Sequence, residues 1–477
     1  MAAATERKLF LGVRLKRIRR DLGLTQTRMA EDLGISPSYL NHLERNQRPV
    51  TAQILLRLAE TYDIDIRGLS SDSDSAGARD LSEVLADQLF RDLGIPRHEV
   101  DEVAQNTPGV ADAIVRLYRA YADRRRLADL GAGDRGEAGQ GGSAVMPSDW
   151  VRDFIQGQRN FFPDLDEKGE ALAGELGAEP QGFFDAARRR LTDRHGVQVR
   201  VTPREVLPDS VRRYDHHRRR LMLSELLAGP GRSFAVAYQL AVQEHDADLA
   251  ALVERAAPPD APTGRLLKVS LANYLAAATL MPYEAFRQAC EGAGHDIDLI
   301  RTRFGASFEQ VCHRMTTLSR PTARGIPFFM LRVDSAGNIS KRFAGAAFPF
   351  SRFGGTCPRW KIHGAFRSPG KILTQIVETP DGRRYFTLAR TVWRIASPYA
   401  EGDSELAVGL GCELKYASRL VYARGVDLAD PAVTQIGPAC RVCERPACRQ
   451  RAVEPAGRTL TVDDFTKSIS PYPFAAG

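Results

Sequence analysis

The sequence predicts a multidomain protein. An all-α helix-turn-helix head and a helical spacer come first, followed by a mainly helical α+β domain and a β-hairpin-rich C-terminal domain with a cysteine metal site. Three observations predict this order. Apolar residues recur at helical spacing up to about residue 312, strand–turn–strand patterns begin after Gly325, and three of the seven cysteines fall within nine residues, from Cys440 to Cys448.

Composition and charge exclude several classes of protein. The chain of 477 residues is 43% hydrophobic and 26% charged, which is typical of globular proteins. It has no run of ~20 apolar residues and no apolar signal segment after its start, MAAATERKLF, so we expect a cytoplasmic protein without a membrane partner. Seven cysteines do not indicate a secreted disulfide scaffold. Residues 1–69 hold 12 Lys and Arg against 8 Asp and Glu, which indicates a polyanionic partner.

Polar and glycine-rich segments predict the domain boundaries. Residues 70–80 are expected to form a linker, and six of the 12 residues from 131 to 142 are Gly, which is typical of a flexible tether. The expected parts are a helix-turn-helix DNA-binding domain (9–69), a helical spacer or dimerisation module (81–128), a flexible linker (129–147), a ligand-sensing domain (150–320) and a C-terminal regulator domain with the cysteine cluster (325–470).

The spacer and the later domains each show a periodic pattern. Ile114, Leu117, Tyr118 and Tyr121 share one helical face, which pairs either with a second copy or with the preceding domain. The predicted strands and hairpins are one strand at 197–201, a hairpin of 328–333 with 339–343, and a second hairpin of 372–378 with 384–394.

The head carries the signals of two short helices joined by a tight turn. Thr25 is placed to cap the first helix, Gly34 suits the turn, and Ser36 followed by Pro37 begins the second helix. With the basic residues that follow, this pattern predicts a DNA-binding helix-turn-helix rather than a structural αα-hairpin.

Residues 22–50 (LGLTQTRMAEDLGISPSYLNHLERNQRPV) closely resemble the Cro/C1-type (XRE) repressor family. The resemblance places Pro37, Ser38, Tyr39 and His42 toward the DNA groove, and it makes Gln26, Arg45 and Arg48 candidates for phosphate contacts. The expected DNA-binding set is Gln26, Ser36, Pro37, Ser38, Tyr39, His42, Arg45 and Arg48.

The middle of the chain resembles the ImmA/IrrE family of zinc peptidases at residues 233–242 and 271–282. That family carries His-Glu-x-x-His on a helix, whereas the aligned positions here are Tyr238, Gln239 and Val242. The third ligand position lacks an acid as well, since no Asp or Glu occurs between Asp260 and Glu284. We therefore expect a metal-less, ImmA/IrrE-like domain with a mainly helical α+β fold and no enzyme activity.

Three histidines remain as substitute ligands in this region: His216, His217 and His245. The neighbouring run of arginines repels a dication, so we expect the two adjacent histidines to lie on a solvated basic helix instead.

The tail contains cysteines at ligand spacing. Cys440, Cys443 and Cys448 are expected to bind a metal with Cys412 as the fourth ligand, and Cys357 could replace Cys412. Four thiolates suit either tetrahedral Zn or an iron–sulfur cluster, and free thiols are the alternative. Cys290 and Cys312 occur in apolar contexts that favour core packing.

Taken together, the order of these parts, with RGIPFFMLRVDSAGNISKRF and IGPACRVCERPACRQRA, resembles the short-chain fatty-acyl regulator family of bacterial transcription factors. The resemblance implies a homodimer that binds operator DNA, senses a short-chain acyl-CoA effector and controls propionate- or acetate-type metabolism. It favours a [4Fe–4S] cluster over Zn. The alternatives are a repressor-cleaving metallopeptidase and an iron–sulfur redox sensor. Candidates for the acyl slot, each of which could instead be core packing, are Asn160, Phe161, Phe162, Tyr238 and Tyr274.

Overall fold

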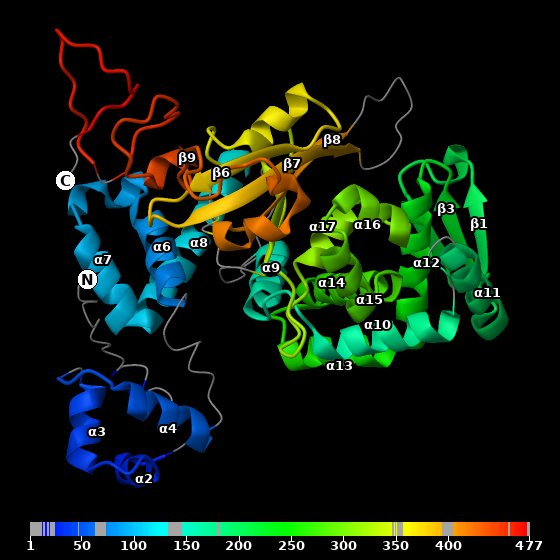
Figure 1. Ribbon diagram of the computed structural model, residues 1–477, viewed down its shortest axis with the longest axis horizontal. Helices are drawn as coiled ribbons and strands as arrows, with labels where there is room; N and C mark the ends of the chain where they lie inside the picture. The colour runs from blue at the N-terminus through cyan, green and yellow to red at the C-terminus, as the bar shows by residue number, and fades with distance from the viewer. Residues whose placement is uncertain are drawn as a thin grey trace. The chain divides into compact units, whose positions relative to one another are not determined.

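The computed structural model describes most of the chain as two compact units, 1–137 and 138–477 (Figure 1). The described residues are 12, 15, 16, 19, 24–45, 47–62, 73–131, 146–177, 179, 182–345, 348, 350, 356–393, 404–456 and 458–474. Each unit is described separately below.

The head of the first unit has the predicted helix-turn-helix. Its helices are α2 (Gln26–Asp32), α3 (Pro37–Glu44) and α4 (Ala52–Tyr62). The predicted caps are confirmed, because Thr25 accepts a hydrogen bond from the Arg28 N–H and Ser36 accepts one from the Tyr39 N–H. Gly34 has a φ of 63°, a conformation that costs glycine little. The head's core consists of Leu15, Met29, Ala30, Leu33, Leu40, Leu43, Val50, Ile54 and Leu58.

The spacer is a small helical module. It comprises α6 (Ser73–Leu85), the 3₁₀ helix η1 (Gln88–Leu93), α7 (Arg97–Asn106) and α8 (Pro108–Gly131). The prediction of a linker at 70–80 is wrong from Ser73 onward, where α6 begins with Ser and Asp, residues that are favourable at helix starts. The predicted linker 129–147 is shortened by α8 and by α9, and its residues 132–145 lie outside the described part of the chain.

The helical part of the second unit includes a small sheet. Its helices are α9 (Pro147–Gly157), α10 (Pro163–Leu176), α11 (Phe183–His195), α12 (Gly229–Glu244), α13 (Asp246–Ala256), α14 (Ala261–Leu280), α15 (Tyr283–Gly292), α16 (Ile297–Phe304) and α17 (Phe308–Met315), with the short 3₁₀ turn η3 (Arg204–Val206). The sheet has the order β1–β3–β2, from β1 (Gln198–Thr202), β2 (Arg212–Asp215) and β3 (Arg220–Ser224).

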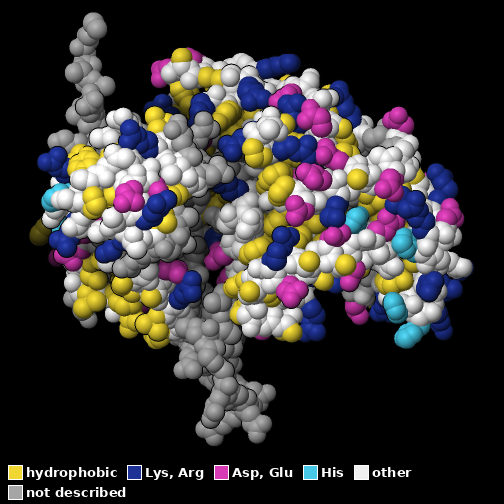
Figure 2. Space-filling view, turned by 90° about the horizontal axis from the view of Figure 1, so that it is seen from below, with side chains coloured by type: hydrophobic (Ala, Val, Ile, Leu, Met, Phe, Trp, Pro, Cys, Tyr) yellow, Lys and Arg dark blue, Asp and Glu magenta, His cyan; other side chains and the backbone are white. Residues whose placement is uncertain are grey.

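This small sheet confirms one prediction and corrects another. The strand expected at 197–201 is β1. The basic helix expected around His216 and His217 is wrong, because both residues lie in the turn between the antiparallel strands β2 and β3. At this end of the unit, Figure 2 shows His, Lys and Arg side chains together on the surface.

A six-stranded sheet forms the rest of the unit, in the order β5–β4–β8–β7–β6–β9. The strands are β4 (Phe329–Val333), β5 (Ile339–Ala344), β6 (Leu373–Glu378), β7 (Arg384–Trp393), β8 (Glu405–Glu413) and β9 (Val433–Gln435). Both predicted hairpins are confirmed as the antiparallel pairs β4–β5 and β6–β7. The short β9 extends the sheet by pairing parallel to β6, and it leads directly into the cysteine-rich segment.

Both faces of this sheet are buried, against different neighbours. Because side chains alternate along a strand, Phe386 and Leu410 lie on one face and share a core with Phe308 and Met315 of α17. On the opposite face, Phe329 and Tyr385 pack with Trp360 and the 3₁₀ helix η4 (Lys361–Arg367). In Figure 1 the green helices accordingly lie beside the yellow and orange strands. The expected domains 150–320 and 325–470 therefore share a continuous hydrophobic core.

Short helical turns complete the C-terminal part of the chain. They are η6 (Leu414–Arg419), η7 (Val421–Ala423) and η8 (Cys440–Val442). Within the described residues, no helix has the length and apolar character needed to cross a bilayer.

Candidate functional site

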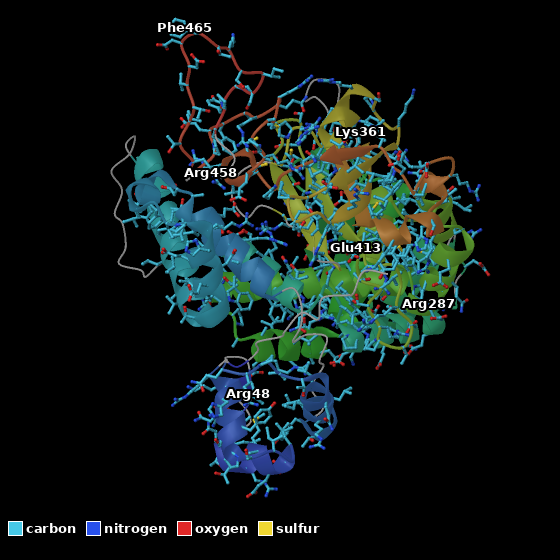
Figure 3. All side chains as sticks on the ribbon, turned by 60° about the vertical axis from the view of Figure 1, so that its left-hand side comes forward. Arg48, Arg287, Lys361, Glu413, Arg458 and Phe465 are labelled. Atoms are coloured by element: carbon cyan, nitrogen blue, oxygen red, sulfur yellow. The ribbon has the colours of Figure 1, made fainter. Side chains whose placement is uncertain are left out.

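The second helix of the head presents the predicted DNA-contacting side chains. Those exposed to solvent are Ser36, Pro37, Ser38, His42, Arg45 and Arg48. Tyr39 is half-buried, and the guanidinium carbon of Arg48 lies 5.9 Å from the centre of its ring. Figure 3 marks Arg48 on the head. The exposed side chains of α3 and of the following turn are thus available to a partner.

Gln26 differs from the other predicted contacts because its amide is engaged inside the head. Its Nε2 donates to Glu44 Oε2 over 2.8 Å and to Asn41 Oδ1 over 3.4 Å. Glu44 also accepts from Arg19 Nε over 2.6 Å. Burial by itself raises the pKa of Glu44, but the hydrogen bonds from Arg19 and Gln26 and the Arg19 charge bring the net pKa below its usual value. This network fixes α3 against the rest of the head.

The peptidase-like positions lie on α12 and have a cation beside them. Tyr238 and Val242 are half-buried, and Gln239 is buried. The guanidinium carbon of Arg212, on β2, lies 3.7 Å from the centre of the Tyr238 ring. Burial lowers the pKa of Arg212, and Tyr238 partly offsets this effect. Sequence analysis did not identify Arg212, because the strand that carries it was not predicted.

The three candidate histidines of this region are not brought together. His216 and His217 are in the β2–β3 turn, whereas His245 follows α12 and its Nδ1 lies 3.1 Å from Asp248 Oδ2.

Several residues predicted for the acyl slot come together in a buried cluster. Asn160 donates from Nδ2 to Thr316 Oγ1 over 2.6 Å, and the rings of Phe162 and Tyr274 meet edge to face at 5.1 Å. The Phe162 N–H donates to the Tyr274 hydroxyl, which itself donates to Asp166 over 2.7 Å. Burial and the Asp166 charge raise the pKa of Tyr274 well above its usual value. As they stand, these side chains pack against one another.

Phe161 and Tyr238 lie at the edges of this region. Phe161 meets Tyr283 edge to face at 6.1 Å, and Tyr238 packs against the same core as Phe162. The acyl slot remains a prediction for all five residues.

Four cysteines line one cavity at the end of the chain: Cys357, Cys440, Cys443 and Cys448. The cavity adjoins the sheet edge formed by β6 and β9, where Arg445 donates to the backbone oxygens of Ile436 and Glu378. The backbone at Gly437 lies so close to the Cys443 side chain that a Cβ at this position would be 2.5 Å from the Cys443 sulfur. Only glycine fits there without a shift.

Cys412, the fourth predicted ligand, lies apart from Cys440, Cys443 and Cys448. It lies on β8, fully buried in the core shared with the helices, on the sheet face opposite the core that contains Cys357. Burial raises its pKa to about 12. The alternation of side chains along β8 directs Cys412 away from the cavity, whereas Cys357 lines it.

The cavity has donors and backbone contacts that suit a thiolate-bound metal group. The Ala452 N–H donates to Cys440 Sγ over 3.5 Å. Burial raises the pKa of the Cys357 thiol, backbone N–H groups of Gly437 and Arg359 oppose this rise, and the nearby Cys440 and Cys443 add to it. As the described side chains stand, no group of three or more His, Cys, Asp or Glu is arranged to hold a metal ion. Four cysteine thiols are therefore the right donor type for Zn or an iron–sulfur cluster, but their sulfurs would have to move closer together to bind either one.

Comparison with known protein families divides the chain into three matched segments. Residues 15–69 match the helix-turn-helix family, and residues 192–316 match the IrrE N-terminal-like domain. Residues 317–472 match the short-chain fatty acyl coenzyme A regulator, C-terminal family.

Relatives of known name extend over nearly the whole chain. The chain is 40% identical over 472 residues to the HTH-type transcriptional regulator RamB of Mycobacterium tuberculosis, with 98% of each protein covered. It is 38% identical over 468 residues to the propionyl-CoA carboxylase regulator of Cereibacter sphaeroides, again with 98% of each covered. A solved structure of a Mycobacterium tuberculosis transcriptional regulator matches with a TM-score of 0.66 and 39% identity, covering 69% of this chain and all of that one. With its helix-turn-helix head and this full-length similarity, the chain belongs to the short-chain fatty acyl coenzyme A regulators, a family of DNA-binding transcriptional regulators.

Proposed function

We propose that this transcriptional regulator responds to a short-chain acyl-CoA that binds within the second unit and changes the affinity of the head for its operator. The full-length similarity to RamB and to the propionyl-CoA carboxylase regulator carries this proposal. An effector alters DNA occupancy only if it binds two arrangements of the protein with different affinity.

The test is a titration of the full-length protein. DNA selected by the protein from a random-sequence library serves as the operator, and its affinity is measured with acetyl-, propionyl- and butyryl-CoA, with free CoA as control. We expect at least one thioester, but not free CoA, to change the affinity and to raise the melting temperature. Equal affinity and melting temperature under all conditions would contradict the proposed effector.

We further propose that Tyr39 and His42 read base edges and that Arg45 and Arg48 contact phosphates. The positions of half-buried Tyr39 and exposed His42 on α3, and of the exposed Arg45 and Arg48 just after it, support this proposal. Gln26, whose amide is engaged by Asn41 and Glu44, is proposed to contact phosphate while keeping α3 in place.

The IrrE-like region is proposed to have no peptidase activity. Tyr238, Gln239 and Val242 do not supply the two ligands and the base that this chemistry uses, and the Arg212 charge beside Tyr238 repels a dication. A full-length variant with Ser at all four cavity cysteines should bind no stoichiometric zinc. Zinc retained by this variant and lost on adding Gln239→Ala would contradict the proposal.

A homodimer is proposed because helix-turn-helix regulators commonly read two half-sites. The helix α8 carries an exposed apolar stripe of Val110, Leu117 and Tyr121, with 52%, 73% and 40% of each residue exposed. Leu117→Glu should reduce the mass measured by sedimentation equilibrium to that of one chain, whereas Arg116→Gln on the same helix should not. A dimer that persists in Leu117→Glu would contradict the assignment of this stripe.

The cavity cysteines are proposed to hold a [4Fe–4S] cluster, with Zn as the alternative. Such a cluster supplies one-electron redox chemistry, while Zn bound by four thiolates is structural. Anaerobically purified protein should contain iron and sulfide and absorb near ~400 nm. An absorption band near ~400 nm in protein that contains no iron, or protein that contains neither iron nor zinc, would contradict the proposed cluster. A change of operator affinity on oxidation with no thioester present would favour the redox-sensing alternative.

A further inference from the structure

Arg451 is a buried cation without an acidic partner. It is 3% exposed, and within the described residues it forms no ion pair with a carboxylate. Its Nη1 donates to Cys440 O over 2.6 Å, and its Nη2 donates to Cys443 O and to Arg445 O, each over 2.8 Å. One guanidinium therefore holds three carbonyls of the cysteine-bearing segment.

One nitrogen of this guanidinium makes no hydrogen bond to any described residue. The Arg451 Nε–H is buried and has no hydrogen-bond acceptor among the described residues. Leaving a buried donor without an acceptor costs about 1–3 kcal/mol, more when the group is charged. Arg451 also lines the cavity that the four cysteines surround. A hydrogen-bond acceptor bound in that cavity would satisfy this N–H.

The charge of the cavity points to the same conclusion. Among the described residues that line it, three are arginines, Arg359, Arg445 and Arg451, and none is acidic. A Zn²⁺ ion or a [4Fe–4S]²⁺ cluster held by four thiolates has a net charge of about −2. The cavity is thus electrostatically matched to an anionic metal–thiolate group.

We propose that Arg451 is the positioning residue and counter-cation of the cysteine centre, an inference that rests on the centre proposed above. Through the three carbonyls it fixes the backbone that presents Cys440 and Cys443. Its charge and its Nε–H stabilise the anionic group in the cavity. Hydrogen bonds and nearby charge of this kind set the affinity and the reduction potential of thiolate-bound centres.

The same guanidinium connects the centre with the end of the chain. The ring of Phe474 lies 5.0 Å from the Arg451 guanidinium carbon and is 6% exposed. Leu460 and Phe474 form an antiparallel bridge, which closes the loop between them. Phe465 in this loop is 99% exposed, and Figure 3 shows it at the far end of the loop. Binding of the group should therefore increase the hydrogen-exchange protection of residues 460–474.

The test compares full-length wild type with Arg451→Gln, Arg451→Lys and Arg449→Gln, each reconstituted anaerobically with iron and sulfide. Arg449 is exposed and two residues away, so it is the matched control for loss of one charge. The measurements are metal and sulfide per chain, the rate of metal loss to a chelator, and the reduction midpoint potential.

We expect Arg451→Gln to lose the group about 10–100-fold faster, the usual effect of removing a partner that supports metal ligands. Its potential should fall, because reduction adds negative charge that the arginine no longer offsets. Arg451→Lys should keep a potential close to that of wild type, and Arg449→Gln should behave as wild type throughout.

Arg451→Gln with the wild-type loss rate and potential overturns the inference. Faster loss with an unchanged potential overturns the counter-cation role, because a purely structural residue gives that result. If Arg451→Gln does not fold, Arg451→Lys decides, because it keeps the charge but loses the contacts to the three carbonyls. The wild-type loss rate in this variant overturns the positioning role, and a lowered potential overturns the counter-cation role. If wild type binds zinc, which has no reduction potential to measure, the rates of zinc loss from wild type and Arg451→Gln are compared instead. Equal rates overturn the inference. Wild type with no metal of either kind instead refutes the centre itself, before any variant is compared.

Discussion

Asp166 and Arg314 form an ion pair with 2.5 Å between Oδ1 and Nη2, and both side chains are completely buried. Arg314 also donates from Nε to Met281 O and from Nη1 to Thr317 Oγ1. The pair thus joins α10 and α17 at the point where the chain leaves the helices for the six-stranded sheet.

This pair gives the first prediction. Asp166→Asn leaves a buried, uncompensated arginine and should destabilise the second unit by about 3–5 kcal/mol, as measured by urea unfolding. Arg287→Ala, which removes the more exposed pair with Glu284, should cost only about 0–1 kcal/mol. A similar loss in both variants would show that the burial of Asp166 and Arg314 does not determine the cost.

The second prediction concerns the pH dependence of the head. The pKa of Glu44 is lowered in the folded state, so its contribution is present above the usual value of 4.5 and is lost as pH falls through the lowered value. Glu44→Gln should reduce the hydrogen-exchange protection of residues 24–62 near neutral pH by about 1.5–3 kcal/mol. It should also make that protection less dependent on pH in the acid range. Protection with the wild-type pH profile would refute the role of Glu44.

The third prediction separates reading of bases from binding of phosphates. Tyr39→Ala and His42→Ala should reduce the preference for the selected operator over unrelated DNA. Arg48→Ala should weaken binding to both and should reduce the salt dependence by about one counterion. The measurement is binding affinity at several salt concentrations. Loss of preference in Arg48→Ala alone would reverse the proposed assignment.

The fourth prediction distinguishes Cys357 from Cys412. Cys357→Ala should lower the metal content of the full-length protein, because it removes a proposed ligand. Cys412→Ala should keep the wild-type metal content and lose some stability, since Cys412 is 0% exposed in an apolar core. Metal analysis and a thermal melt of each variant decide this. The opposite pattern would restore Cys412 as the ligand.

The fifth prediction uses the close approach at Gly437. Gly437→Ala would place a Cβ 2.5 Å from the Cys443 sulfur and should displace it, with loss of the bound metal. Gly364→Ala is the matched control, because the nearest atom to its added Cβ is Leu373 Cδ1 at 3.8 Å. Equal metal content in the two variants would contradict this prediction, because the segment around Gly437 and Cys443 would then accommodate the Cβ without losing the metal.

Helix caps, tight turns and hairpins could be predicted from the sequence, because the residues that determine them are close together in the chain. Thr25, Gly34 and Ser36 act within a few residues of themselves, so their roles in the head were predictable. The two hairpins were predictable for the same reason, since their turn residues lie between the paired strands.

Features that depend on distant contacts were not predictable. The strand that carries Cys412 reads ELAVGLGCE and is buried on both faces, so it lacks the apolar–polar alternation that would reveal which way the sulfur points. Arg451 is one of several arginines in the tail, and nothing local distinguishes the buried one from the exposed Arg449. The basic run around His216 is compatible with a helix or a hairpin until its partner strand is known.

The core shared by the helices and one face of the six-stranded sheet affects how such proteins can diverge. Phe308 and Leu410 lie in the same core although they belong to segments matched by different families. A substitution that enlarges one of them is tolerated best when a neighbour across the core becomes smaller. Recombination between relatives at residue 317 would combine a helical part and a sheet whose core side chains had not evolved together. The head has a core of its own. Exchange of the head alone could therefore change the recognised operator without disturbing the packing between the helices and the six-stranded sheet.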